Sequence, residues 1–356
     1  MRLNRCLFRT LSSALALLAL TTACDVHEIP EFPEAEPLVL RLQFDTDLTP
    51  WHHSVKQSQV SEVSVGTPAP SLCTNGVMRY VVAAYPMLNG RVLSSQLVRQ
   101  FAFDRTLNGG YDNSLTVALP AGDYKVMVWA DLRANALDAP CYLTDDFAEI
   151  TLQGNYRGST ILRDAFRGTA DASVTTSIVL HNPDTINIAM QRPMARYEFI
   201  STDLKEFIDK EVENTRTRGE MSEVDEKAPY RRIETDDYRI VFYYNGFMPS
   251  AYNMFLDKPV DSSTNVHFTS QITQLNDKEA SIGFDYVFVN GKSTSVTTQI
   301  AIYNRAGERI SLTDPIDIPL KRSHHTILRG AFLTQSSSKG LVINPDFEGE
   351  YNIIIP

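Results

Sequence analysis

The stretch Leu115–Ala130, LTVALPAGDYKVMVWA, decides the fold class. Two apolar runs, Leu115–Leu119 and Tyr124–Ala130, lie on either side of the turn Pro120-Ala121-Gly122. Short apolar runs with period-two alternation are typical of strands, and Pro and Gly favour a turn between them. We therefore predict a β-hairpin here, and we expect an all-β chain around it.

The alternation of apolar and polar side chains also occurs on the N-terminal side of this stretch, and it continues after it. Leu38–Phe44 alternates apolar and polar side chains, which predicts a strand with one buried face. The breaker cluster His181-Asn182-Pro183-Asp184 then predicts a domain boundary. Further strands of this first half are predicted at 77–86, 97–103, 147–152, 162–166 and 174–180.

The strand pattern restarts after this boundary. Ile282–Phe288 alternates up to Asn290-Gly291 and Ser295–Tyr303 follows, which predicts a type I′ hairpin. Asp203–Glu213 has apolar residues at helical spacing and is the one helix expected. Each half shows roughly seven short strands, which favours one β-sandwich per half. The other strands of this half are predicted at 185–190, 197–200, 238–244, 252–256, 266–272, 316–320, 326–333 and 352–355.

The N-terminus predicts export as a lipoprotein. A segment with three arginines precedes the apolar run 11–20, and small residues lead to Cys24. The run is shorter than the roughly 20 residues of a membrane-spanning helix. We expect cleavage before Cys24 and lipid on its thiol. Thr21 stands where a lipobox usually has leucine, so an ordinary cleaved signal with a free Cys24 is the alternative.

The residues after Cys24 predict a tether. Residues 25–37, DVHEIPEFPEAEP, are acidic and proline-rich, a composition that cannot pack a core. The expected organisation is a signal peptide at 1–23, a lipidated acidic tether at 24–37, an N-terminal β-sandwich at 38–182 and a C-terminal β-sandwich at 183–356.

Charge excludes one class of partner. Without the three arginines of the signal peptide, the mature chain has 30 Lys and Arg against 43 Asp and Glu, a net charge of −13. Nucleic-acid binding selects a basic face, so no nucleic-acid partner is expected. The membrane is expected to be reached through the lipid on Cys24.

Two of the four cysteines are candidates for a disulfide. Cys6 is lost with the signal peptide, and Cys24 carries the lipid. Cys73 and Cys141 remain in an oxidising compartment, where an even pair favours a bridge. Two buried free thiols are the alternative.

Little in the sequence predicts chemistry. The adjacent histidines His52-His53 and His324-His325 would point to opposite faces of a strand, so a shared metal is not expected. No nucleophile, phosphate-loop or metalloprotease motif is present, and no catalytic residue, metal or cofactor is predicted. Trp129 lies within a predicted strand and is expected in the core, whereas Trp51 is a candidate for surface contact.

Several motifs carry a resemblance to a known family. They are Leu119–Tyr124 (LPAGDY) running into Val126–Ala130 (VMVWA), Arg192–Phe199 (RPMARYEF), Gly283–Gly291 (GFDYVFVNG) and Ile343–Phe347 (INPDF). The chain resembles the fimbrillin-like surface lipoproteins of Gram-negative gut and oral anaerobes, and among them the FimB-like fimbrial anchor lipoproteins.

The resemblance implies two tandem transthyretin-like, Greek-key β-sandwiches on a lipid anchor at the outer membrane, exposed on the cell surface. It also implies fimbrial partners bound by β-strand addition. Stalk subunits of the family are cut by a protease in the first domain. Here the arginine-rich segment, with Arg216 and Arg218, is in the second half, which favours an uncleaved anchor or minor subunit.

Two functions follow, neither of them enzymatic. The first is a fimbrial anchor, minor subunit or adhesion component, which an exposed sheet edge would favour. The alternative is a glycan-binding surface lipoprotein of a polysaccharide-uptake system, which a row of exposed aromatic residues on one sandwich face would favour.

Overall fold

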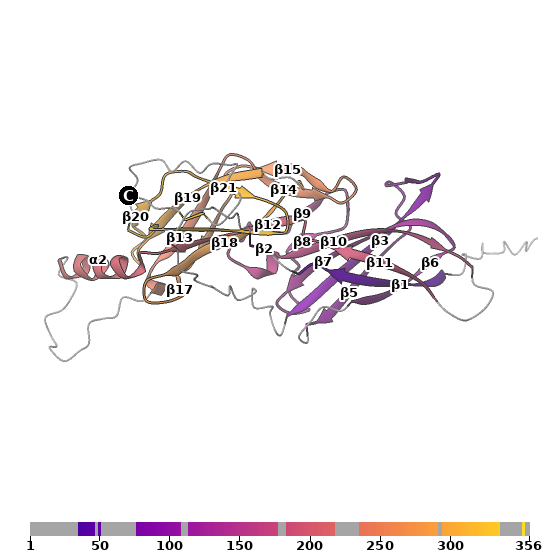
Figure 1. The fold of residues 1–356 in the computed structure, drawn as a ribbon, viewed down its shortest axis with the longest axis horizontal. Coiled ribbons are helices and arrows are strands. Elements are labelled where there is room, and N and C mark those ends of the chain that lie inside the picture. Colours follow the sequence, from indigo (N-terminus) through magenta and orange to yellow (C-terminus); the bar gives the residue numbers. More distant parts are fainter. Residues whose placement is uncertain are drawn as a thin grey trace, which may run out of the picture.

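The computed structural model describes residues 35–46, 49–50, 76–107, 113–176, 183–217, 235–290, 294–334 and 351–352. Figure 1 shows two β-sandwiches arranged end to end along the longest axis, with β1 and β3 at one end and β13 and β19 at the other. The all-β prediction with two tandem sandwiches is confirmed.

The first sandwich packs two sheets around one apolar core. One sheet has the order β11 (Asp184–Met190), β1 (Ala35–Phe44), β6 (Ser114–Pro120). The other has the order β10 (Ala165–Val174), β7 (Gly122–Arg133), β3 (Val77–Leu88), with β5 (Arg99–Thr106) and the short β4 (Arg91–Val92) both paired to β3. The face predicted for the first strand is confirmed, because Leu38, Leu40 and Leu42 are buried in this core.

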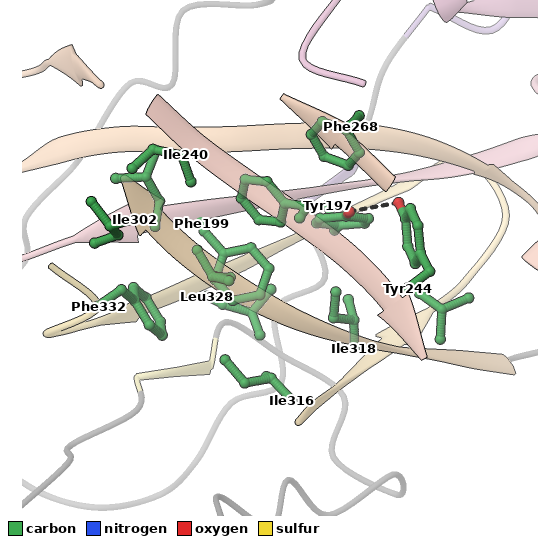
Figure 2. Close-up of a cluster of buried hydrophobic side chains, with 14 of the residues drawn as sticks. Tyr197, Phe199, Ile240, Tyr244, Phe268, Ile302, Ile316, Ile318, Leu328 and Phe332 are labelled. Carbon is green, nitrogen blue, oxygen red and sulfur yellow. Dashed lines mark hydrogen bonds between the residues drawn. The ribbon is translucent and has the colours of Figure 1, made fainter. Parts of the chain in front are cut away.

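The second sandwich is larger. One sheet has the order β17 (Thr273–Gln274), β18 (Ala280–Phe288), β12 (Met194–Ser201), β22 (His324–Gly330), β2 (Thr49–Pro50), and β23 (Tyr351–Asn352) also pairs with β22. The other has the order β16 (His267–Ser270), β13 (Arg239–Asn245), β19 (Thr294–Tyr303), β20 (Arg309–Leu312), and β21 (Ile316–Leu320) also pairs with β19. Figure 2 shows the aromatic and aliphatic side chains that fill the space between them.

One α-helix, two short 3-10 helices and a small sheet complete the described chain. Helix α2 (Leu204–Thr217) buries Phe207 against Tyr238, with ring centroids 4.8 Å apart. The two short 3-10 helices are η1 (Ile161–Arg163) and η2 (Thr235–Asp237). A small sheet of β8 (Tyr142–Leu143), β9 (Ile150–Leu152), β14 (Met248–Asn253) and β15 (Lys258–Ser263) takes two strands from each half of the chain.

Both predicted hairpins are wrong. β6 and β7 belong to different sheets, and so do β18 and β19. At the first site, the Tyr124 hydroxyl donates to the Pro120 carbonyl at 2.9 Å and holds a corner between the two sheets. Alternating strands on either side of a turn look the same in sequence whether the chain pairs with itself or crosses to the facing sheet, as in a Greek key.

The strand expected to open the second half lies in the first sandwich. β11 pairs in parallel with β1, from Leu38 with Asp184 to Phe44 with Met190. The chain therefore changes sandwich near Gln191, and not at Asn182. A breaker cluster marks a turn in the chain, but the partner chosen by the next strand depends on a segment more than a hundred residues away.

Several element boundaries also differ from expectation, and three of them have a clear reason. β1 begins at Ala35 and includes Pro37, because a proline is tolerated near the start of a strand. The segments 162–166 and 174–180 were expected as two strands, but β10 runs unbroken from Ala165 to Val174. Helix α2 continues to Thr217, since no proline or glycine interrupts it before Gly219.

Candidate functional site

The two sandwiches meet at a buried aromatic junction. Trp129 on β7 lies at its centre, with ring centroids 5.2 Å from Tyr142 and 6.4 Å from both Tyr252 and Phe288. Tyr252 and Phe288 come from the second half of the chain. The sheet of β3 and β7 is therefore buried on both faces, one in the first sandwich and one at this junction.

A buried ion pair supports the indole of Trp129. The Arg79 guanidinium binds both carboxylate oxygens of Asp131, with 2.9 Å between Nε and Oδ1. The Trp129 indole donates to Asp131 Oδ2 at 3.0 Å. Burial raises the pKa of Asp131, and the hydrogen bond and charge of Arg79 oppose that rise. This carboxylate is enclosed by its partners and fixes the Trp129 ring in one orientation.

A segment of the first half, residues 154–163, extends across the second sandwich; we call it the strap. Its Arg163 reaches Asp285 on β18 with 2.6 Å between Nη1 and Oδ1. The hydroxyls of Tyr156 and Tyr244 each donate to Asp285 Oδ2 at 2.6 Å. Tyr244 in turn shares a 2.6 Å hydrogen bond with Tyr197, drawn as the dashed line in Figure 2.

The environment of Asp285 is closed. Its residue is 1 % exposed, and burial raises its pKa, while the charge of Arg163 and the two tyrosine hydroxyls act in the opposite direction. The Arg163 side chain is 4 % exposed. These groups are closed off from solvent and hold one another by an ion pair and hydrogen bonds. The cluster around Asp285 therefore acts as a structural lock between the two sandwiches.

The strap approaches the second sandwich so closely that it needs glycines. A Cβ added to Gly158 would lie 2.3 Å from the Phe268 ring, and one added to Gly283 would lie 2.4 Å from the Phe242 ring. The backbone N–H of Ser159 donates to the Phe284 carbonyl at 2.8 Å, as a strand neighbour would.

We predict that Gly158→Ala lowers the free energy of unfolding by about 1–3 kcal/mol, the usual cost of overpacking a core. Urea unfolding of the variant measures this loss. The matched variant carries Phe268→Leu in addition, and it is expected to lose less than the sum of the two single variants, because the smaller side chain makes room for the new methyl group. Additive losses would contradict direct contact between the two positions.

A polar cluster lies beside β22. The Glu198 carboxylate contacts Arg196 at 2.9 Å and His325 at 3.3 Å. It also accepts a 2.7 Å hydrogen bond from Ser281. Burial alone would raise the pKa of Glu198, but the hydrogen bond to His325 and the charge of Arg196 outweigh it and lower the pKa to about 2.

This shift predicts an acid-sensitive contribution to stability. Because the folded-state pKa lies below the unfolded value, the stabilisation is complete above about pH 4.5 and disappears as the pH falls through about 2. Its size is about 3 kcal/mol. We expect Glu198→Gln to remove this part of the pH dependence, as measured by urea unfolding between pH 2 and 6. Parallel curves for wild type and variant would contradict the assignment.

The outer edge of β22 is a candidate binding site, separate from the buried lock at Asp285. Its inner edge pairs with β12 from His325 to Gly330. On the outer edge, β2 pairs with His324 and His325, and β23 pairs with Leu328 and Arg329. Both are parallel and two residues long, and within the described chain Thr326 and Ile327 pair with nothing on that side. Among the described residues, two short strands, β2 and β23, are what pairs with this edge.

The residues predicted as sites are distributed as follows. Cys24, Cys73 and Trp51 lie outside the described residues. Cys141 is partly buried beside the junction and forms no disulfide with any described residue. Its bridge to Cys73 stays a prediction. Trp129 is fully buried, which confirms its place in the core.

The sequence reasoning missed the lock between the sandwiches. One signal was available, since Asp285 is the only acid in the apolar run Ile282–Val289. A lone acid within a buried strand needs a partner. Nothing local, however, identifies that partner as Arg163, which is 122 residues away along the chain.

Within the described ranges, no three His, Cys, Asp or Glu side chains lie close enough together to hold a metal ion. No helix of the described chain is both long and apolar enough to cross a membrane.

Residues 33–356 match the model of a family of unknown function, DUF6562. The chain belongs to this family. The match spans both sandwiches and the junction between them. No curated protein matches this DUF6562 chain.

Three solved structures are similar to this DUF6562 chain. The fimbrial anchor protein Mfa2 from Porphyromonas gingivalis is 10 % identical, with 78 % of this chain and 82 % of that chain covered and a TM-score of 0.38. A proposed adhesin from Bacteroides ovatus is 11 % identical, with 80 % and 82 % covered and a TM-score of 0.41. A proposed polysaccharide-binding protein from Bacteroides thetaiotaomicron is 13 % identical, with 78 % and 79 % covered and a TM-score of 0.38.

Proposed function

We propose that this chain is a non-enzymatic lipoprotein of the outer membrane, exposed at the cell surface, that anchors a fimbria or serves as its minor subunit or adhesion component. The outer edge of β22 is the observation that carries the proposal. Exposed strand edges offer unpaired N–H and C=O groups, and an extended segment of a partner can add to them as a new strand.

The length of β22 suits such an addition. The strand has seven residues, and its two outer neighbours within the described chain cover two residues each. A partner strand that replaced β2 and β23 would gain main-chain hydrogen bonds along the whole edge. The buried lock at Asp285 and the junction at Trp129 would keep the two sandwiches in one orientation while the partner is held.

The position of β1 supports an anchoring role. The proposed lipid on Cys24 is separated from β1 by residues 25–34, a span of at most about 35 Å when extended. β1 is the central strand of its sheet, with seven residues paired to β11 and seven to β6. Tension from the membrane would therefore enter the fold through a strand that is hydrogen-bonded on both sides.

The lipid is tested by Cys24→Ala in intact cells. We expect the wild-type chain to sediment with the outer membrane and to be cut by added protease. The variant is expected to lose membrane association, because its acyl chains are absent. Unaltered membrane association of the variant would contradict the lipoprotein proposal.

The partner is tested by site-specific photo-crosslinking on whole cells. A photoreactive amino acid in place of Ile327, at the centre of the β22 edge, is expected to capture a fimbrial subunit. The matched control places the same group at Ser263 on β15, an exposed strand of the small sheet. Equal capture at both positions, or capture at neither, would contradict strand addition at β22.

A further inference from the structure

The solvent-facing side of β13, β16, β19 and β20 has an unusual composition; we call it the tyrosine face. Side chains alternate along β13, with Ile240, Phe242 and Tyr244 in the core. Arg239 and Tyr243 therefore point outward. Because directly paired residues share a face, the register adds Gln299 and Tyr303 from β19, His267 from β16 and Arg309 from β20.

The two tyrosines of this face lie along the sheet. Tyr243 pairs with Gln299, and Arg239 pairs with Tyr303, so the tyrosine backbones are four residues apart along the strands. Their hydroxyl oxygens are nevertheless 3.0 Å apart. The side chains must lean toward each other, over Val241 and Ala301, which are 4 % and 0 % exposed although they point outward. The result is an aromatic platform over these two buried residues.

Polar groups border this platform at one end. The His267 ring lies 5.9 Å from the Tyr243 ring with 32° between their planes. The Asn245 amide donates to Gln299 Oε1 at 3.1 Å. The hydrogen bond to Tyr303 and partial burial raise the pKa of Tyr243. A neutral tyrosine hydroxyl can both donate and accept a hydrogen bond.

The other end of the platform is positively charged. The Arg239 guanidinium lies 4.9 Å from the centre of the Tyr303 ring, and Arg309 pairs with Tyr303 along the sheet. Both arginines are exposed, both act electrostatically on Tyr243, and neither forms an ion pair with any residue in the described ranges. In a chain with a net charge of −10, two exposed cations that form no ion pair with any described residue are a local exception.

We propose that the tyrosine face binds an acidic oligosaccharide, with sugar rings stacked on Tyr243 and Tyr303 and a sugar carboxylate held by Arg239 and Arg309. Tyrosine offers a rigid surface that is apolar on its face and polar at its tip, at a low cost in conformational entropy. Arginine forks match carboxylates in two-point hydrogen bonds, and a guanidinium over an aromatic ring keeps its N–H groups available for this.

A protein partner suits this face less well. Protein interfaces usually have an apolar centre. In the described chain, none of the large exposed apolar side chains stands on β13, β16, β19 or β20; they are Leu88, Leu97, Val98, Leu137, Leu143, Phe247, Leu256, Val260 and Leu275. The face offers phenols, amides and cations, the groups that contact a hydroxylated and charged ligand. One carboxylate, Asp317 on β21, lies beside Thr297 at the end opposite the arginines. This proposal is independent of the strand edge at β22.

The test is calorimetric titration of the purified full chain, in detergent, with oligogalacturonate of four to six sugars and with maltohexaose as the neutral probe. We expect oligogalacturonate to bind and to weaken as salt is raised. The double variant Arg239→Ala/Arg309→Ala is expected to lower affinity about tenfold or more, as the loss of charge-assisted hydrogen bonds does. Tyr303→Ala is expected to lower it to a similar degree.

The matched control is Arg305→Ala, which removes the same charge from the turn after β19. Arg305 is 71 % exposed and lies 3.7 Å from Asp237. The affinity of the Arg305→Ala variant for oligogalacturonate should stay within twofold of the wild-type value. Circular dichroism checks that each variant is folded. Three results would each overturn the proposal. They are equal binding of maltohexaose, unchanged affinity of the double variant, and absence of sugar binding with a protein captured on this face.

Discussion

Arg163→Ala is expected to lower the free energy of unfolding by about 3–5 kcal/mol, the usual result of removing one partner of a buried ion pair. The variant leaves the Asp285 carboxylate in the core with its tyrosine donors and no counter-charge. The Arg163 guanidinium also donates to the Tyr286 carbonyl at 2.9 Å, so a backbone contact between the two halves is lost with it. Urea unfolding measures the loss.

A surface pair provides the control for this prediction. Arg305→Ala breaks a pair in which Arg305 is 71 % exposed, and it should cost no more than about 1 kcal/mol. The double variant Arg163→Met/Asp285→Leu removes both charges and is expected to recover much of the lost stability, because no unpaired charge stays buried. A loss below 1 kcal/mol for Arg163→Ala would contradict the lock between the sandwiches.

Trp129→Ala is expected to have a comparable effect, about 3–5 kcal/mol, because it empties the centre of the junction. The ring contacts Tyr142 from the first half and Tyr252 and Phe288 from the second. We also expect the variant to be cut between its sandwiches by limited proteolysis, since the surfaces that hold them together lose their largest shared side chain.

Trp129→Phe separates the loss of the hydrogen bond from the loss of ring packing, and Leu137→Ala serves as the surface control. Trp129→Phe keeps an aromatic ring but loses the hydrogen bond from the indole to Asp131, so an intermediate loss is expected. Leu137→Ala removes a side chain that is 97 % exposed and should leave stability within about 0.5 kcal/mol of wild type. Equal stability of Trp129→Ala and Leu137→Ala would show that the junction does not hold the sandwiches together.

The sequence predicted the strands better than it predicted their partners. The alternation at Leu38–Phe44 identified the buried face of β1, and the runs around Trp129 identified the strands of the junction. The turns at Pro120-Ala121-Gly122 and Asn290-Gly291 were read as hairpins, yet each connects two facing sheets. β15 and β20 were missed because they carry mostly exposed polar residues or are only four residues long.

Neither the tyrosine face nor the outer edge of β22 could be predicted from the sequence. The tyrosine face depends on Tyr243 and Tyr303 meeting across two strands, which requires the register of β13 against β19. The outer edge of β22 depends on which strands lie beside β22, and distant segments of the chain set those neighbours. The sequence indicated only that exposed aromatic residues or a free edge would each favour a different function.

By itself, the sequence determined that this protein is made of short strands with one buried face, and it predicted an export signal at the N-terminus and no nucleic-acid partner. These are properties of side chains and their spacing. Only the tertiary structure decided that β11 joins β1, that Arg163 meets Asp285 and that the described neighbours on the outer edge of β22 cover two residues each. Backbone hydrogen bonds are the same for every strand, so the choice among partners depends on the packing of segments far apart in the chain.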